Sequence, residues 1–135
     1  MLAFRRAVEA RDFGRIGELL AEDVVFHSPI AFKPYRGREM LATILNIMPT
    51  IFEDFAFQRK IGAETDDDHA LVFGARIGEL WIQGCDFLHT SNDGLIDELT
   101  VMLRPIKAVH AFEEQMRAKF AAAVETAPDK QTAAQ

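Results

Sequence analysis

The sequence contains a single cysteine, Cys85, which excludes a framework of disulfide bonds within the chain. It also has no apolar run that approaches the ~20 residues a membrane-spanning helix needs, so we expect no membrane partner. Basic residues are scarce, since 15 Lys and Arg stand against 21 Asp and Glu, and the net charge is −6. Binding to a phosphate backbone requires a basic stripe, so we expect no nucleic-acid partner.

The sequence shows neither the spacing of metal ligands nor a phosphate-binding loop, although it contains histidines and a run of aspartates. The histidines do not show the spacing of a metal site; they are His27, His69, His89 and His110. The run from Asp66 to Asp68 resembles a calcium loop only in its charge, and no glycine-rich phosphate loop occurs. We therefore expect no metal and no cofactor. Residues 1–6 lack the apolar stretch of a signal peptide, so we expect a cytoplasmic protein.

What is present is the composition of one globular domain, with 135 residues, 49% of them hydrophobic and 27% charged. We expect this domain to span residues 1–122. Residues 123–135 are expected to form a frayed C-terminal tail, because the chain from Thr126 onward lacks large apolar side chains.

Hydrophobic spacing predicts two N-terminal helices, the second capped by Asp12, then a short strand and a third helix that ends at Pro49. The period then changes from helical to alternating, which predicts four antiparallel strands over residues 55–61, 70–77, 80–90 and 95–104. A last helix follows Pro105. The order α-α-β-α-β-β-β-β-α, with helices grouped before an antiparallel sheet, is typical of the α+β class.

The turns set an expected register, in which Ile77 pairs with Leu80 and Thr90 pairs with Leu95. Alternation then gives the sheet an apolar inner face and a mixed outer face. The outer face carries more apolar area than a solvated surface usually does, from residues that include Trp81, Phe87 and Met102. We therefore expect a homodimer through this outer face.

Asp86 is the exception on the inner face, where the expected register puts it between Leu71 and Leu99. An ionised carboxylate is costly to bury among leucines. One interpretation is that the strand twists and Asp86 caps a backbone group at the edge of the sheet. The other is a carboxylic acid with a raised pKa in an apolar pocket, which makes it a candidate for acid–base chemistry.

Several short motifs resemble the NTF2-like superfamily in their order and spacing, over about residues 1–122. They are Arg11-Asp12-Phe13, the run from Leu19 to Phe26, Ser28-Pro29, Arg36-Gly37, Gly84-Cys85-Asp86, and Asp93 to Ile96 leading into Arg104-Pro105. Within the superfamily the chain looks most like the SnoaL-like group, which includes ketosteroid isomerases and polyketide cyclases. The resemblance implies a cone, in which a curved antiparallel sheet wraps on the N-terminal helices as a cystatin-like α+β barrel. It also implies a C-terminal helix, an internal ligand pocket and frequent dimerisation through the outer sheet face.

The same resemblance places Asp86 where ketosteroid isomerases have a protonated aspartate that stabilises an oxyanion. Their proton-shuttling aspartate corresponds to Ser28 here, and a tyrosine that donates to the oxyanion corresponds to Phe4, so most of that catalytic set is missing. His27 is the candidate for the missing base, because its ordinary pKa is suited to that work. Strand alternation leaves open that His27 points away from the pocket.

These observations predict a protein that binds a small apolar, polyketide- or steroid-like molecule, with proton-transfer isomerase or cyclase activity that uses Asp86. The alternative is a non-catalytic module for ligand binding or dimerisation. Besides Asp86 and His27, the expected site contains the residues that should line the pocket: Phe4, Phe26, Ser28, Ile44, Met48, Phe57, Phe73, Ile82, Leu88, Leu99, Val101 and Leu103.

Overall fold

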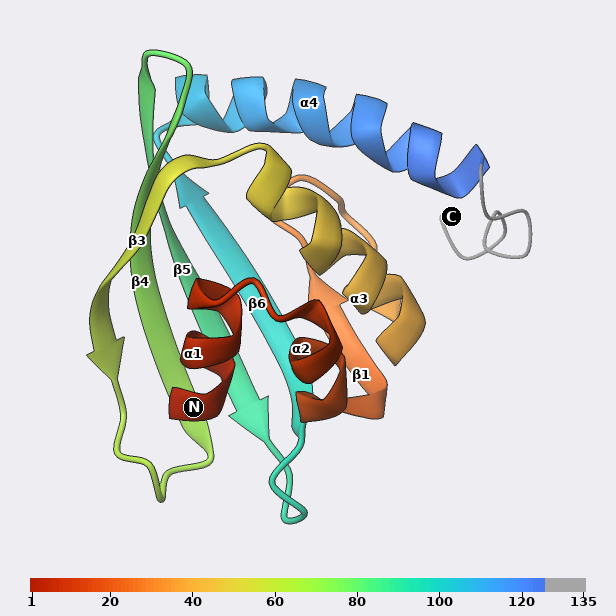
Figure 1. Ribbon diagram of the computed structural model, residues 1–135, viewed down its shortest axis with the longest axis vertical. Coiled ribbons are helices and arrows are strands. Elements are labelled where there is room, and N and C mark those ends of the chain that lie inside the picture. The colour runs from red at the N-terminus through yellow and green to blue at the C-terminus, as the bar shows by residue number, and fades with distance from the viewer. Residues whose placement is uncertain (126–135) are drawn as a thin grey trace.

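The computed structural model describes residues 1–125, and these form helices on one side of a curved sheet (Figure 1). The helices are α1 (Leu2–Glu9), α2 (Phe13–Leu19), α3 (Arg38–Ile47), the short 3₁₀ helix η1 (Met48–Thr50) and α4 (Ile106–Glu125). The strands are β1 (Leu20–His27), β2 (Tyr35–Arg36), β3 (Glu53–Ile61), β4 (Asp68–Ile77), β5 (Leu80–Thr90) and β6 (Ile96–Arg104). The predicted order of elements is confirmed, and β2 and η1 are added to it.

Local chemistry explains where the N-terminal helices begin and end. The Asp12 carboxylate accepts a hydrogen bond of 3.1 Å from the backbone nitrogen of Arg15, which caps α2 as predicted. Pro49 cannot donate a backbone hydrogen bond, so the helical chain tightens there into η1 and turns toward β3.

The sheet has six strands in the order β2-β1-β6-β5-β4-β3 and does not close into a barrel. Strands β3 to β6 form the antiparallel meander that alternation predicts. The expectation of a wholly antiparallel sheet is wrong at one place, because β1 runs parallel to β6. Strand β1 follows α2 and pairs with the edge of β6 that β5 does not occupy. Its direction is therefore set by the helices before it and not by a hairpin.

The register of the meander is partly as predicted. Ile77 does lie opposite Leu80 across the β4–β5 turn. On the other side, Asp86 lies opposite Val101 rather than Leu99, because Thr90 pairs with Ile96 and the register shifts again just beyond that pair. The combined error is two residues, and an even shift leaves every side chain on its predicted face.

The core lies between the inner face of the sheet and helices α1 to α3, which cover that face in Figure 1. Most inner-face residues of β4, β5 and β6 are almost completely buried, whereas Trp81 on the outer face is 66% exposed. Helix α4 runs past the end of this sandwich and buries Ala108, Phe112 and Met116. Phe112 stacks on Phe52, with 5.4 Å between the ring centroids.

Helix α4 continues to Glu125, so residues 123–125 of the expected tail are helical. Residues 126–135 lie outside the part of the chain that the structure describes. Within residues 1–125, no helix is both long and apolar enough to cross a membrane.

Replacing Phe112 with alanine should lower the free energy of unfolding by roughly 3–5 kcal/mol, because a ring that is 1% exposed would leave a cavity. Urea titration followed by circular dichroism measures the change. The matched control on the same helix is Ile106→Ala, at a side chain that is 72% exposed, where about 0.5 kcal/mol or less is expected. Similar losses in the two variants would contradict the packing described for α4.

Candidate active site

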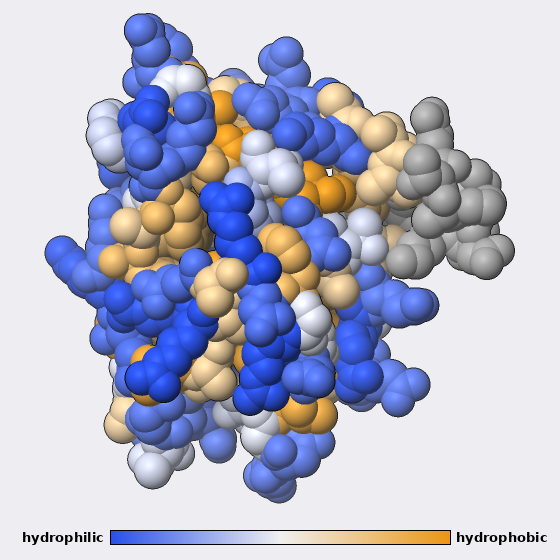
Figure 2. Space-filling model, in the orientation of Figure 1, coloured by the Kyte–Doolittle hydropathy of each residue, from blue (hydrophilic) through white to orange (hydrophobic). Residues whose placement is uncertain are grey.

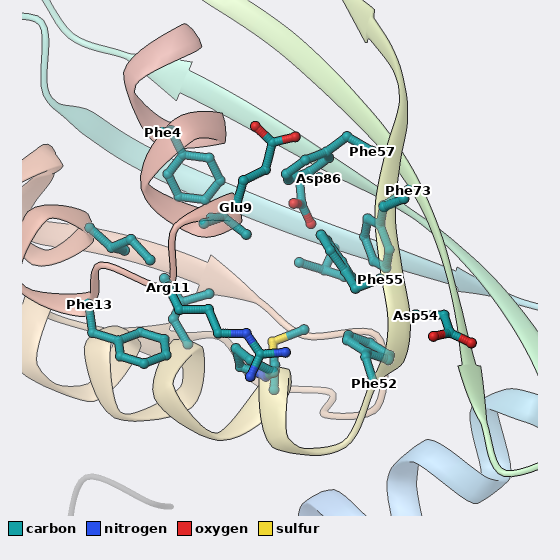
Figure 3. Close-up of a pocket in the computed structure, with 17 residues that line it drawn as sticks. Phe4, Glu9, Arg11, Phe13, Phe52, Asp54, Phe55, Phe57, Phe73 and Asp86 are labelled. Carbon is teal, nitrogen blue, oxygen red and sulfur yellow. The ribbon is translucent and has the colours of Figure 1, made fainter.

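A pocket of about 460 Å³ lies between the N-terminal helices, the end of α3 and the strands β3 to β6 (Figure 3). In Figure 2 an apolar area lies between β3 and the helices, and hydrophilic side chains border it. The residues that line the pocket are Phe4, Val8, Glu9, Arg11, Phe13, Ile16, Leu45, Met48, Pro49, Phe52, Asp54, Phe55, Ala56, Phe57, Phe73, Asp86 and Val101.

Aromatic rings from β3, the segment before it, and β4 form one wall of the pocket (Figure 3). Phe55 packs against Phe73 and Phe57, with ring centroids 4.9 and 5.0 Å apart. Phe52 extends this cluster, at 5.7 Å from Phe73. A wall of this kind offers apolar contact to a ligand and few polar groups to satisfy.

Gly84 makes room for this wall. It lies directly opposite Phe73 across the β4–β5 pair, two residues before Asp86 on the same strand. A Cβ atom at residue 84 would overlap the ring of Phe73. Glycine therefore allows Phe73 to lie against the sheet, beside the position at which Asp86 enters the pocket.

Asp86 is the one charged residue on the floor of this pocket, and its residue surface is only 9% exposed. Its neighbours across the strands are Leu71 and Val101. Within residues 1–125 the carboxyl group has no hydrogen bond and no ion pair to another side chain or to the backbone. Burial without such a partner disfavours the ionised form and raises the pKa of Asp86 to about 7.

A carboxyl group with this pKa is available in both forms near neutral pH. The acid can donate a hydrogen bond to a ligand oxygen, and the carboxylate can accept a proton from a ligand carbon. Of the two interpretations of Asp86, the geometry favours the carboxylic acid in an apolar pocket over a cap at the sheet edge, since β5 is paired on both sides at this point.

The remaining charged residues lie at the mouth of the pocket. Glu9 accepts a hydrogen bond of 3.4 Å from Arg5, and the guanidinium of Arg5 lies 5.4 Å from the centre of the Phe57 ring. Asp54 binds Arg76 through contacts of 2.6 and 2.8 Å. Arg11 lines the mouth from the connection between α1 and α2.

The structure does not bring His27 to Asp86. His27 pairs with Thr100 on the outer face of the sheet, and its Nε2 atom lies 2.9 Å from a carboxylate oxygen of Glu98. Ser28 does not line the pocket either; its hydroxyl oxygen accepts a hydrogen bond of 3.2 Å from the backbone of Ile30. The carboxyl group of Asp86 therefore has neither of the two expected partners beside it.

The other predicted pocket residues divide into two sets. Five line the pocket: Phe4, Met48, Phe57, Phe73 and Val101. The rest pack elsewhere, mostly in the core beneath the helices: Phe26, Ile44, Ile82, Leu88, Leu99 and Leu103. Ile44 belongs to α3, and the others lie on the inner face of the sheet beneath the helices or neighbouring side chains. A face assignment alone therefore predicts burial and not which residues line the pocket.

Most pocket residues that the sequence did not predict come from two regions: the end of α1 with the start of α2 and the connection between them, and β3 with the segment before it. The aromatic residues Phe52 and Phe55 lie close to the predicted Phe57 in sequence, and this clustering was a usable signal. Glu9, Arg11 and Asp54 gave no such signal, because an isolated charged residue in a sequence usually lies in solvent. Among the described residues, no three or more His, Cys, Asp or Glu side chains lie close enough together to hold a metal ion.

Comparison with known proteins agrees with this fold. The model of the SnoaL-like domain family matches residues 1–99. A steroid delta-isomerase from Pseudomonas aeruginosa is 35% identical, with 90% of this chain and 89% of that chain covered and a TM-score of 0.84. An uncharacterised protein with a cystatin-like fold from Silicibacter pomeroyi is 32% identical, with 97% and 89% covered and a TM-score of 0.84.

The chain belongs to the SnoaL-like domain family, and its fold is NTF2-like. An NTF2-like protein of unknown function from Cytophaga hutchinsonii shares the fold at 20% identity, with 78% of this chain and 88% of that chain covered and a TM-score of 0.63. No curated protein matches the chain.

The raised pKa of Asp86 predicts how stability depends on pH. In the unfolded chain this carboxyl group has a pKa of ~3.9, which is lower than its pKa in the folded protein. Protonation of Asp86 therefore stabilises the folded protein at low pH. That contribution falls as the pH rises above about 4 and is lost once it passes the folded pKa of about 7. Each pKa unit corresponds to about 1.4 kcal/mol, so ionisation opposes folding by roughly 4 kcal/mol at high pH.

Asp86→Asn removes the ionisation and keeps the shape, so this variant should unfold at higher urea than the wild type at pH 8 and at a similar urea concentration at pH 4. The exposed Asp23 on β1 provides the control, because Asp23→Asn should follow the wild-type curve at both pH values. An NMR titration that places the Asp86 carboxyl at or below pH 4 would contradict the buried-acid interpretation.

Proposed function

We propose that the protein binds a small, largely apolar carbonyl compound of steroid- or polyketide-like shape and isomerises or cyclises it by proton transfer through Asp86. The observation that carries the proposal is the Asp86 carboxyl group, which has no partner within residues 1–125 and faces a pocket walled by aromatic rings. A ligand is the natural partner for such a group, since an unpaired carboxyl group is otherwise costly to bury.

The proposed chemistry uses both forms of the carboxyl group. The carboxylate takes a proton from a carbon atom next to the ligand carbonyl, and the electron pair of that C–H bond moves to form an enolate. The acid then returns the proton to a different carbon, so the double bond moves and no cofactor is consumed. A pKa of about 7 suits both steps at neutral pH, and the phenylalanine wall excludes the water that would compete for the proton.

Pocket size and kinship support the same class of ligand. A volume of about 460 Å³ falls in the range of roughly 300–1,000 Å³ that is common for small-molecule sites. The 35% identical protein from Pseudomonas aeruginosa is named a steroid delta-isomerase. The relationship favours a compact polycyclic ketone as the ligand, and the pocket is large enough to hold one.

A second candidate function is ligand binding without catalysis. Phe4 lines the pocket and has no hydroxyl group to stabilise an enolate oxygen, and His27 lies on the other face of the sheet. At the mouth, Glu9 and Asp54 are engaged with Arg5 and Arg76. In this role the neutral Asp86 would only donate a hydrogen bond to the ligand carbonyl.

A steroid with a ketone on ring A and an unconjugated ring double bond tests the catalytic proposal, because isomerisation creates a conjugated ketone that absorbs in the ultraviolet. Asp86→Asn should lower turnover by about 100-fold or more, the usual loss for a general acid–base group. The Kd for the steroid should stay within about threefold, since the amide can still donate a hydrogen bond. Asp23→Asn is the control and should change neither quantity.

The outcomes separate the two candidates. Wild-type protein that binds the steroid without turning it over would favour the binding module. Turnover that survives in Asp86→Asn would contradict the role given to this carboxyl group. If the steroid does not bind at all, the proposed ligand class is wrong.

We further propose a homodimer through the outer face of the sheet. Trp81, Phe87 and Met102 are 66, 42 and 57% exposed, which is unusual for large apolar side chains on one face. A second copy, placed by a two-fold axis, would cover the same residues on both molecules at once.

Charge placed on this face should break the dimer. We expect Trp81→Glu and Met102→Glu to sediment as monomers at micromolar concentration, and wild type at about twice the mass of the chain. Ile106→Glu is the control, because Ile106 is 72% exposed but belongs to α4 rather than to the sheet. A monomeric wild type would overturn the proposal.

A further inference from the structure

The connection between α1 and α2 holds an arginine in a backbone conformation that favours glycine. Arg11 has a φ of 55°. Its backbone nitrogen donates to the carbonyl oxygen of Val8 at 3.1 Å, and that of Asp12 donates to Ala7 at 2.9 Å. These two bonds are those of the Schellman motif that closes a helix, in which the residue at this position is most often glycine. A side chain kept at a strained position is a reason to search for its use.

The side chain of Arg11 borders the pocket. Figure 3 shows it extending from the α1–α2 connection toward the side of the pocket where Phe52 lies. Within residues 1–125 its guanidinium group makes no hydrogen bond and no ion pair. The acidic residues of the pocket mouth are each engaged with another arginine, Glu9 with Arg5 and Asp54 with Arg76. The mouth therefore keeps a guanidinium group that makes no ion pair within the described residues.

We propose that Arg11 is a specificity-determining residue, which binds a carboxylate on the ligand at the mouth while the apolar body of the ligand fills the pocket. The natural ligand is then an apolar keto acid rather than a neutral ketone. This inference rests on the proposed function, since it assigns the opposite end of the same ligand whose carbonyl meets Asp86. A guanidinium group suits the task, because its parallel N–H groups match the two oxygens of a carboxylate.

The arrangement also fixes which end of the ligand enters first. A carboxylate that entered the pocket would meet the faces of aromatic rings, which carry negative charge density, and a partly ionised Asp86. A carboxylate that stays at the mouth meets Arg11 instead. The two charged residues at opposite ends of the site thus favour one orientation, with the carbonyl group toward Asp86.

A matched pair of probes tests this inference: a steroid with a ketone on ring A and a carboxyl group on ring D, and its methyl ester. Wild-type protein should bind the acid about three- to tenfold more tightly than the ester at low salt, since exposed ion pairs are weak. The preference should shrink in high salt. Arg11→Met should bind the two probes equally, because it removes the guanidinium group that distinguishes the acid from the ester.

Two further variants separate this role from a role in the fold. Arg11→Gly should also lose the preference for the acid, while its thermal midpoint rises because glycine adopts the positive φ without strain. Arg15→Met is the control, because Arg15 is an exposed arginine on α2 that contacts Glu18 and does not line the pocket. It should keep the wild-type preference.

Equal affinity of wild type for the two probes, or a preference that survives in Arg11→Met, would overturn the role of Arg11 and leave the proposed function standing. A wild type that binds neither probe would overturn both. The ester distinguishes the two failures, since its binding depends on the apolar pocket and Asp86 and not on an ion pair with Arg11.

Discussion

Pairing of β5 on both sides is the constraint from which the rest of the site follows. A strand held between β4 and β6 can point its side chains in only two directions, and residue 86 shares the inner direction with Ile82, Gly84 and Leu88. The pairing therefore points the carboxyl group into the apolar layer, despite the free-energy cost of removing it from water. The pocket makes this position tolerable, because it leaves the group 9% exposed instead of sealing it among leucines.

The aromatic wall depends on the same strand. Gly84 leaves the space in which the ring of Phe73 lies, Phe73 contacts Phe55 and Phe52, and Phe52 stacks on Phe112 of α4. A continuous chain of packed side chains thus connects the floor of the pocket with the C-terminal helix. The fold and the site share one core, so the walls of the pocket are as rigid as the packing behind them.

The sequence predicts the direction of Asp86 more securely than it predicts its neighbours. Alternation assigns residue 86 to the inner face, and this result survives an error of two residues in the β5–β6 register. The identity of the opposing residue, Val101 rather than Leu99, depends on the pairing of Thr90 with Ile96 and on a register shift between His89 and Thr90, neither of which has a clear mark in the sequence. The parallel pairing of β1 with β6 could not be read locally either, because it depends on how α1 and α2 pack.

The pocket was harder to predict than the fold for a related reason. Phe57 and Phe73 follow from alternation, since they pair directly across β3 and β4. Glu9, Arg11 and Phe13 come from the end of α1, the connection and the start of α2, and only tertiary packing places this segment over the sheet. His27 shows why proximity in sequence to a motif does not place a residue in the site. It directly follows the buried Phe26 on β1, so its side chain points to the opposite face of the sheet.

The irregular edge of the sheet has a consequence for the solution behaviour of the protein. A free strand edge can recruit a strand from another molecule and begin aggregation. Here the outermost strand β3 shifts register at two places and carries the exposed residues Arg59 and Lys60, and the opposite edge, β2, is only two residues long. Both edges are therefore poor templates for strand addition. Because β3 is also a wall of the pocket, the pocket lies beside a strand edge that is poorly suited to pair with a strand of another molecule.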